Sequence, residues 1–118
     1  MKAPKPGTPV RGSRTGRPIM AALDLLGRRT ALRIIWELRD NPLTFRALQA
    51  ACDTNSSLLN SRLAELREAR LVELAEQGYQ LTEQGRKLLQ ALHPFAVWSN
   101  GWAKSLETKP DARKPTRS

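Results

Sequence analysis

The chain has few of the residues that build covalent frameworks and metal sites. Its 118 residues include one cysteine and one histidine, and aromatic residues make up only 5%. A lone cysteine cannot form an internal disulfide, and no His/Cys spacing typical of a metal site occurs. One cysteine and one histidine also offer little basis for a Cys/His nucleophile pair. We therefore expect a non-enzyme without a cofactor, whose fold depends on its hydrophobic core.

Long apolar runs are also missing. No uninterrupted apolar stretch approaches the roughly 18 residues that cross a bilayer, and the Pro/Gly/Arg-rich N-terminus lacks the apolar centre of a signal peptide. We expect no membrane partner and a cytoplasmic, nucleoid-associated protein. A chain of 118 residues with 40% apolar content has room for one small domain at most.

Acidic residues are outnumbered, 11 against 20 basic ones, which gives a formal net charge of +9. Residues 1–18 carry five bases and no acid, and residues 104–118 carry five bases and two acids. Both ends are rich in Pro, Gly, Ser and Thr. We predict a disordered basic arm over 1–17, a folded domain over 18–106 and a disordered basic tail over 107–118. Such arms suit DNA, because each cation near a phosphate releases a counterion; the alternative is that they only solubilise the chain.

Apolar residues three or four positions apart predict four helices in the first part of the domain. These cover 19–26, about 28–39, 45–52 and about 56–69. Pro18 and Gly27 mark the two ends of the first, Pro42 stops the second, and Thr44 caps the third. The residues expected inside are Leu32, Ile35, Trp36 and Leu38, then Phe45, Leu48, Ala51 and Cys52, and finally Leu59, Leu63 and Leu66.

The third and fourth helices, joined by a short polar turn, have the pattern of a helix-turn-helix, in which the second helix enters the major groove. The residues expected at DNA are Ser57, Asn60, Ser61 and Ala64 on the outward face of the fourth helix, with Arg46 and Arg62 beside them. Asn60 can pair with adenine, Ala64 can touch a thymine methyl group, and the two arginines suit phosphates. Glu65 and Glu68 would repel phosphate, so the far end of the helix should point away from the DNA. The alternative for all of these residues is an ordinary solvated surface.

Two strands follow, over 71–75 and 79–81, around the turn Glu76-Gln77-Gly78. A hairpin directly after a helix-turn-helix is a wing. Thr82 caps a last helix that Pro94 should kink, and its apolar stripe is long for a chain of this size. A second copy would cover it, giving a two-fold homodimer, unless the stripe closes the core of one chain. The dimer residues expected on this helix are Leu92, Phe95, Trp98 and Trp102.

Cys52 and His93 are the two residues with reactive side chains that remain. Cys52 lies on the apolar side of the third helix, which predicts a buried structural thiol; a redox or metal switch is the alternative. His93 precedes Pro94 and should lie on the helix surface or at the dimer seam, and nothing in the sequence supports a role in sensing pH.

Several short segments occur in the order of a known family. They are Leu23-Asp24-Leu25-Leu26-Gly27 before a basic pair, Phe45 and Leu48, then Leu59, Leu63 and Leu66, Leu71-Val72, Tyr79-Gln80-Leu81-Thr82 with Gly85, and Trp98. With them, the chain from residue 17 to about 106 resembles the HxlR-type winged-helix transcriptional regulators, which are relatives of the MarR-like proteins. The resemblance implies a homodimeric bacterial DNA-binding repressor or activator, with dimer contacts from its first and last helices. It thereby adds Leu23 of the first helix to the expected dimer residues.

The chain also departs from that family's pattern. Arg17 stands in place of the family's cysteine before the first helix, so redox sensing by that cysteine is not available. Thr30 replaces the usual Trp after the basic pair, and Arg70 the usual Gly before Leu71. The wing sequence Glu73–Gly78 carries no Arg or Lys, which argues against strong phosphate contact by the wing. The basic arms could compensate for this lack.

We therefore predict a mainly α (α+β) winged helix-turn-helix with a two-stranded wing and a long C-terminal dimerisation helix. Its expected partner is double-stranded DNA carrying a roughly palindromic operator, read through the helix over 56–69. The alternative is a winged-helix protein-interaction module that has no sequence-specific DNA readout. A small-molecule effector is left open: a pocket for it is conceivable between the dimer helices and the winged core, but no group of polar residues in the sequence identifies one.

Overall fold

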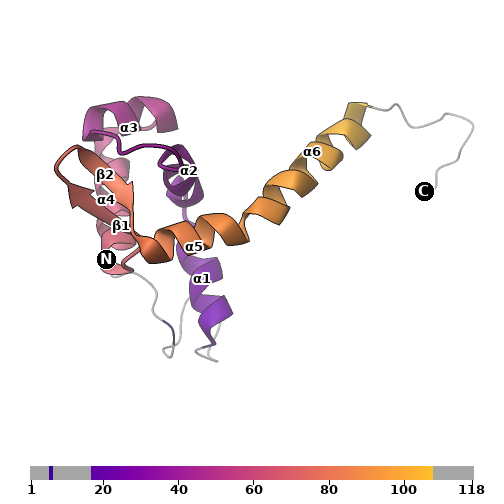
Figure 1. Cartoon of the computed structure of the whole chain (residues 1–118), viewed down its shortest axis with the longest axis horizontal. Helices are drawn as coiled ribbons and strands as arrows, with labels where there is room; N and C mark the ends of the chain where they lie inside the picture. Colours follow the sequence, from indigo (N-terminus) through magenta and orange to yellow (C-terminus); the bar gives the residue numbers. More distant parts are fainter. Residues whose placement is uncertain (1–5, 7–16, 108–118) are drawn as a thin grey trace, which may run out of the picture.

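The computed structural model describes Pro6 and residues 17–107, so nearly all of the predicted basic arm and of the basic tail lies outside the described residues. The elements, in chain order, are α1 (Pro18–Leu26), α2 (Ala31–Glu37), α3 (Phe45–Cys52), α4 (Ser56–Glu68), β1 (Val72–Ala75), β2 (Gly78–Leu81), α5 (Glu83–Ala91) and α6 (His93–Glu107) (Figure 1). This order confirms the predicted winged helix-turn-helix. Within the described ranges, no helix has both the length and the apolar character needed to cross a membrane.

Side-chain caps determine where three of the helices begin. The Oγ1 atom of Thr44 accepts a hydrogen bond from the backbone N–H of Ala47 at 3.1 Å, and that of Thr82 accepts one from Gly85 at 3.0 Å. Both caps were predicted from the sequence. Asn55 caps α4 in the same way, since its Oδ1 accepts from the N–H of Leu58 at 2.7 Å. Each cap satisfies a donor that the helix cannot satisfy itself.

The second helix is shorter than predicted, and this changes which of its residues are buried. Arg28 and Arg29 lie in the turn before it, and Thr30 closes that turn with a φ of 77°. The helix therefore presents to the core the stripe Ala31, Ile34, Ile35 and Leu38, all at most 1% exposed. The predicted burial of Trp36 is wrong: at 100° per residue it lies off this stripe and is 41% exposed. The guanidinium of Arg39 covers its ring at 4.3 Å.

The core lies between α2, α3, α4 and the wing. Leu59, Leu63 and Leu66 of α4 are at most 2% exposed, as predicted, and they join Leu48 of α3 and Val72 of β1 in one cluster. This arrangement presents the opposite face of α4 to the outside.

The wing is an antiparallel hairpin with a two-residue turn at 76–77, so β2 begins one residue earlier than predicted. Leu43 extends the pairing, because it exchanges backbone hydrogen bonds of 3.0 and 2.8 Å with Tyr79. Gly78 has a φ of 135°, and a Cβ there would lie 2.5 Å from the carbonyl oxygen of Leu43. Only glycine therefore allows the wing to lie this close to the loop before α3.

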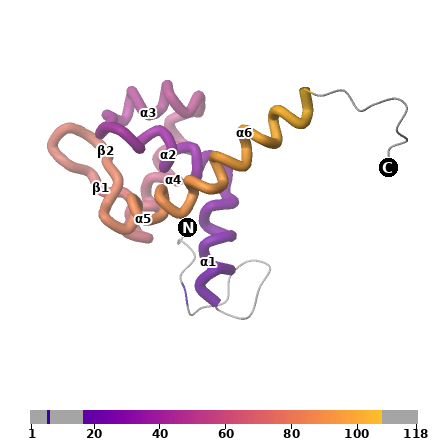
Figure 2. Tube along the Cα trace, turned by 45° about the vertical axis from the view of Figure 1, so that its right-hand side comes forward, coloured from indigo at the N-terminus to yellow at the C-terminus, as the bar shows by residue number. Residues whose placement is uncertain are grey.

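The predicted single last helix is in fact two helices. Leu92 ends α5, with its N–H bonded to the carbonyls of Leu88 and Leu89, and Pro94 has no N–H with which to continue the ladder. The effect is larger than the expected kink: α6 starts again at His93 and runs away from the rest of the molecule, as both views show (Figures 1 and 2).

Candidate nucleic-acid interface

The N-terminal half of α4 carries an exposed face of small side chains. Ser57, Asn60, Ser61 and Ala64 are all exposed, as the helical period predicted, because Leu59 and Leu63 hold the other side of the helix in the core. None of the four carries a charge. A helix with such a face can come close to the base edges of a major groove, where amide and hydroxyl groups have partners on every base pair.

Arg46 lies close to this face in sequence, in the first turn of α3. Its side chain is exposed, and the structure gives it no ion pair within the described part of the chain. It borders a shallow depression together with Gln49, Ala50, Asp53 and Thr54, which links α3 to the turn before α4. An exposed guanidinium in the helix before α4 is of the kind that binds phosphate.

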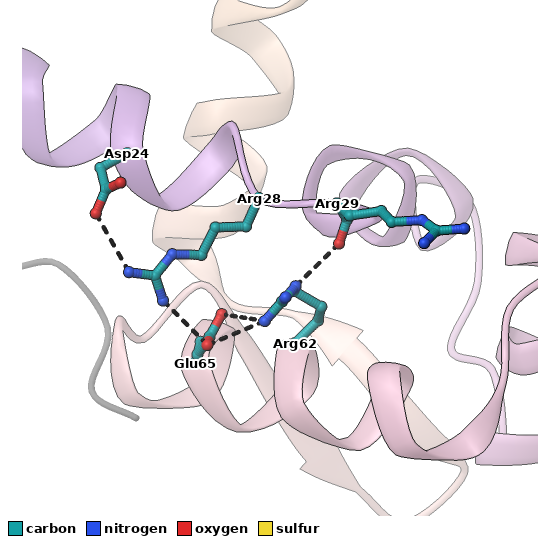
Figure 3. A network of polar contacts seen from close by, with 5 residues as sticks. All are labelled: Asp24, Arg28, Arg29, Arg62 and Glu65. Atoms are coloured by element: carbon teal, nitrogen blue, oxygen red, sulfur yellow. Dashed lines mark hydrogen bonds and ion pairs between the residues drawn. The ribbon is translucent and has the colours of Figure 1, made fainter. Parts of the chain in front are cut away.

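Arg62 lies in a different environment from the one expected of a phosphate ligand. Its Nη1 donates to both carboxylate oxygens of Glu65 at 3.0 Å, and its Nε donates to the carbonyl oxygen of Arg29 at 2.9 Å (Figure 3). Its side chain is 16% exposed. Two of its three nitrogens are thus bound inside the chain, and Arg62 holds α4 against the α1–α2 turn.

Glu65 is the centre of this network. Its side chain is 3% exposed, and a second arginine, Arg28, approaches it with Nη1 at 3.0 Å (Figure 3). Arg28 also binds Asp24 of α1 at 3.2 Å. The expectation that Glu65 repels phosphate is therefore wrong, because its charge is buried and balanced by two arginines. The three-residue spacing of Arg62 and Glu65 allows an ion pair along one helix, whereas the partnership with Arg28 depends on tertiary packing.

The wing carries no cation. Its exposed side chains include Glu73 and Glu76, and Glu73 accepts a hydrogen bond from Gln80 across the two strands at 2.7 Å. Leu74, 53% exposed, lies between them. A wing of this composition has no side chain that would attract a phosphate.

A second exposed surface lies on α6 and is apolar. Phe95, Trp98 and Trp102 are 58%, 54% and 52% exposed, and their rings stack in series with centroids 5.6 and 5.5 Å apart. Leu23 of α1 is 59% exposed. Leu92 differs from the other predicted dimer residues, since it is partly buried and packs against the winged core.

An apolar groove separates α2 from the start of α6. It has a volume of about 340 Å³ and is lined by Leu32, Arg33, Trp36, Leu92, Phe95, Ala96 and Ser99. Arg33, the charged residue of this lining, is bound to Glu37 at 2.6 Å and to the carbonyl oxygen of Ala51 at 2.7 Å.

Cys52 and His93 lie outside these surfaces. Cys52 is 8% exposed within the core, and this burial raises the pKa of its thiol, which disfavours the reactive thiolate. His93 is exposed at the first position of α6. Within the described ranges, no group of three His, Cys, Asp or Glu side chains could hold a metal ion.

Comparisons with known proteins place the chain among transcriptional regulators. Residues 24–94 match the family described as the N-terminal domain of the methanogenesis regulatory protein FilR1. The structure is similar to that of quinone-bound YodB from B. subtilis, with a TM-score of 0.65 and 30% identity over 70% of this chain and 96% of YodB. It is also similar to a protein from Thermoplasma volcanium described as a possible HxlR family transcriptional factor, with a TM-score of 0.64 and 25% identity over 74% of this chain and 85% of that protein. No curated protein matches the chain by sequence.

Proposed function

The chain belongs to the winged-helix DNA-binding transcriptional regulators of the HxlR type, and from this membership we propose that it acts as a homodimer that reads a roughly palindromic operator with α4. The observation that carries the proposal is the exposed, uncharged face of Ser57, Asn60, Ser61 and Ala64. Asn60 is the specificity residue of this face, because its amide can pair with both the N6 and N7 positions of adenine.

The dimer is proposed to form through α6 and α1. The stacked aromatic side chains of α6 and Leu23 of α1 would meet their copies about a two-fold axis. Two α4 helices related by such an axis would enter successive major grooves on one side of the duplex. The operator would therefore have two inverted half-sites about 10 base pairs apart, centre to centre, or a multiple of that distance.

Affinity in this proposal comes mostly from phosphates. Arg46 supplies one contact beside α4, and the basic segments 1–17 and 107–118 supply the sequence-independent part. The wing contributes little, since it has no Lys or Arg between residues 72 and 81.

The test is a selection of binding duplexes from a random library, followed by fluorescence anisotropy on the selected duplex with excess random DNA as competitor. We expect an inverted repeat to be enriched and the binding to resist the competitor. Asn60→Ala should lower the preference for the selected duplex by about 1–3 kcal/mol. Gln90→Ala, which removes an exposed amide from α5, is the matched control and should change nothing.

The exposed Leu74 between two acids of the wing favours one second candidate, a winged-helix module that binds another protein without reading DNA sequence. That candidate predicts that the selection enriches no sequence and that random competitor removes all bound DNA.

A further inference from the structure

The turn between α1 and α2 is attached to the recognition helix by two successive residues. The carbonyl oxygen of Arg29 accepts the 2.9 Å hydrogen bond from Nε of Arg62, and the side chain of Arg28 reaches Glu65 at 3.0 Å. Thr30, with its φ of 77°, then turns the chain into α2. The backbone at residue 29 is thus held beside the middle of α4.

The three arginines at this turn are used differently. Arg28 and Arg62 face the buried carboxylate of Glu65, and Arg28 also faces Asp24, so two acids balance these two bases. Arg29 contributes its carbonyl oxygen to the network and not its charge. Its side chain is exposed, and its guanidinium points away from Glu65 and Asp24 (Figure 3). Among Asp24, Arg28, Arg29, Arg62 and Glu65, the formal charges therefore sum to +1, and no acid of this group faces the guanidinium of Arg29.

The surface of α4 is hollowed beside the proposed base-reading face. A depression of about 260 Å³ is lined by Ser61, Arg62, Ala64 and Glu65. Ser61 and Ala64 belong to the proposed base-reading face, and Arg62 and Glu65 to the network below the turn. A helix in a major groove has a sugar–phosphate backbone along each side, and this depression borders the base-reading face where one of those backbones would pass.

We propose that Arg29 is a phosphate-binding residue, which contacts the DNA backbone alongside α4. The inference rests on the proposed function and adds a contact that the basic pair in the sequence did not by itself indicate. A guanidinium suits the site because its N–H groups can bind two phosphate oxygens at once. The Arg62 hydrogen bond holds the backbone of Arg29 in place, so fewer degrees of freedom are lost when the contact forms. A phosphate contact carries no sequence information, so it should strengthen binding to all duplexes alike.

The experiment measures the dissociation constant of the full chain against salt concentration, on the selected duplex and on a random one. The variants are Arg29→Ala, Arg29→Lys and the control Arg86→Ala, which removes an exposed arginine from α5. We expect Arg29→Ala to weaken binding by about fivefold for each protomer at physiological salt, on both duplexes. The slope of log K against log salt should become shallower by about 0.9 for each protomer. Arg29→Lys should retain the slope, and Arg86→Ala should bind like the parent protein.

Three results would overturn the inference. Arg29→Ala could bind both duplexes with unchanged affinity and slope, or could lose affinity only for the selected duplex, as a base contact would. It could also lose affinity together with a lower melting temperature, which would assign the loss to folding. The phosphate contact predicts an unchanged melting temperature, because the hydrogen bond from Arg62 goes to the backbone of residue 29 and survives the substitution. A failure of the proposed function looks different: the parent protein would then not distinguish the two duplexes, while the salt slope on random DNA would still report on Arg29.

Discussion

Helices α4 and α6 have similar apolar spacing, but the apolar side chains of α4 are buried and those of α6 are exposed. Leu63 and Leu66 of α4 are at most 2% exposed, whereas Phe95, Trp98 and Trp102 of α6 are more than half exposed. Helix α4 is enclosed by α2, α3 and β1. Helix α6 instead extends away from the rest of the molecule, which is called the body below and comprises the elements from α1 to α5 (Figure 2). The spacing of apolar residues along a helix therefore identifies its apolar face, but it does not identify the surface that packs against that face.

The two helices also differ in the charged residues that they carry: α4 has a buried acid, and the apolar stripe of α6 has no charge. Inside the body, Glu65 of α4 is buried against Arg28 and Arg62, which is stabilising only because all partners are in place. The apolar stripe of α6 contains no charged residue, and the exposed half of each of its aromatic side chains is apolar area that a second copy could cover. The apolar side chains of the body are thus buried within one chain, whereas those of α6 would be buried by a second copy in the proposed dimer.

The largest effect should come from breaking the charge network of the body. Glu65→Gln leaves two arginine side chains facing an uncharged amide in a buried site, which should lower the free energy of unfolding by about 3–5 kcal/mol. Urea denaturation measures this loss, and the difference from the parent protein should be the same at every protein concentration. Glu76→Gln, which changes an exposed acid in the turn of the wing, is the control. Equal losses in the two variants would show that the network contributes nothing special.

A smaller effect, and one that depends on protein concentration, should follow from breaking α6. Trp98→Ala removes the middle ring of the stack and should weaken the proposed dimer by about 2–4 kcal/mol, as truncation of a central interface residue does. Sedimentation velocity over a range of concentrations measures the dimer constant. Leu74→Ala, which removes an equally exposed apolar side chain from the wing, should leave that constant unchanged. A Trp98→Ala protein that dimerises like its parent would show that the stripe is not the interface.

The hydrogen bonds of Thr82, between the wing and α5, are a local interaction within the body. Thr82 Oγ1 accepts from Gly85 and donates to the carbonyl oxygen of Arg70 at 2.7 Å, so it ties the end of α4 to the start of α5. Thr82→Ala should lower the free energy of unfolding by about 1–2 kcal/mol, which thermal denaturation will detect. Thr82→Ser keeps the hydroxyl and should recover most of the loss. No recovery would assign the effect to the missing methyl group.

The smallest effect concerns the thiol of the body. Burial raises the pKa of Cys52 in the folded state, so its stabilising contribution is fully present below the pKa of the unfolded thiol and is lost as the pH rises through the folded value. Above pH of about 8.5, the parent protein should therefore lose stability faster than Cys52→Ala. A thiol reagent such as DTNB should react slowly with the native chain and fast in denaturant. Equally fast reaction in both would contradict the buried position.

Much of the proposed DNA-binding face could be predicted from the sequence. The outward positions of Ser57, Asn60 and Ala64 follow from the phase of the leucines on the same helix, and the caps at Thr44 and Thr82 follow from residues three positions away. The partners of Arg62 could not be predicted in this way. Its hydrogen bond to Arg29 spans 33 positions, and helical phase carries no information over that distance.

The sequence by itself determined the order and type of the elements, the start of α3 and α5, and the face of α4 that remains uncovered. These depend on backbone hydrogen bonds and side-chain periods, which act over about four residues. Only the tertiary structure decided that Trp36 is exposed, that Glu65 is neutralised, that Arg29 keeps its charge available and that α6 leaves the body. Each of these features depends on contacts with residues that are distant in the sequence, because burial and charge balance are determined by neighbours in space.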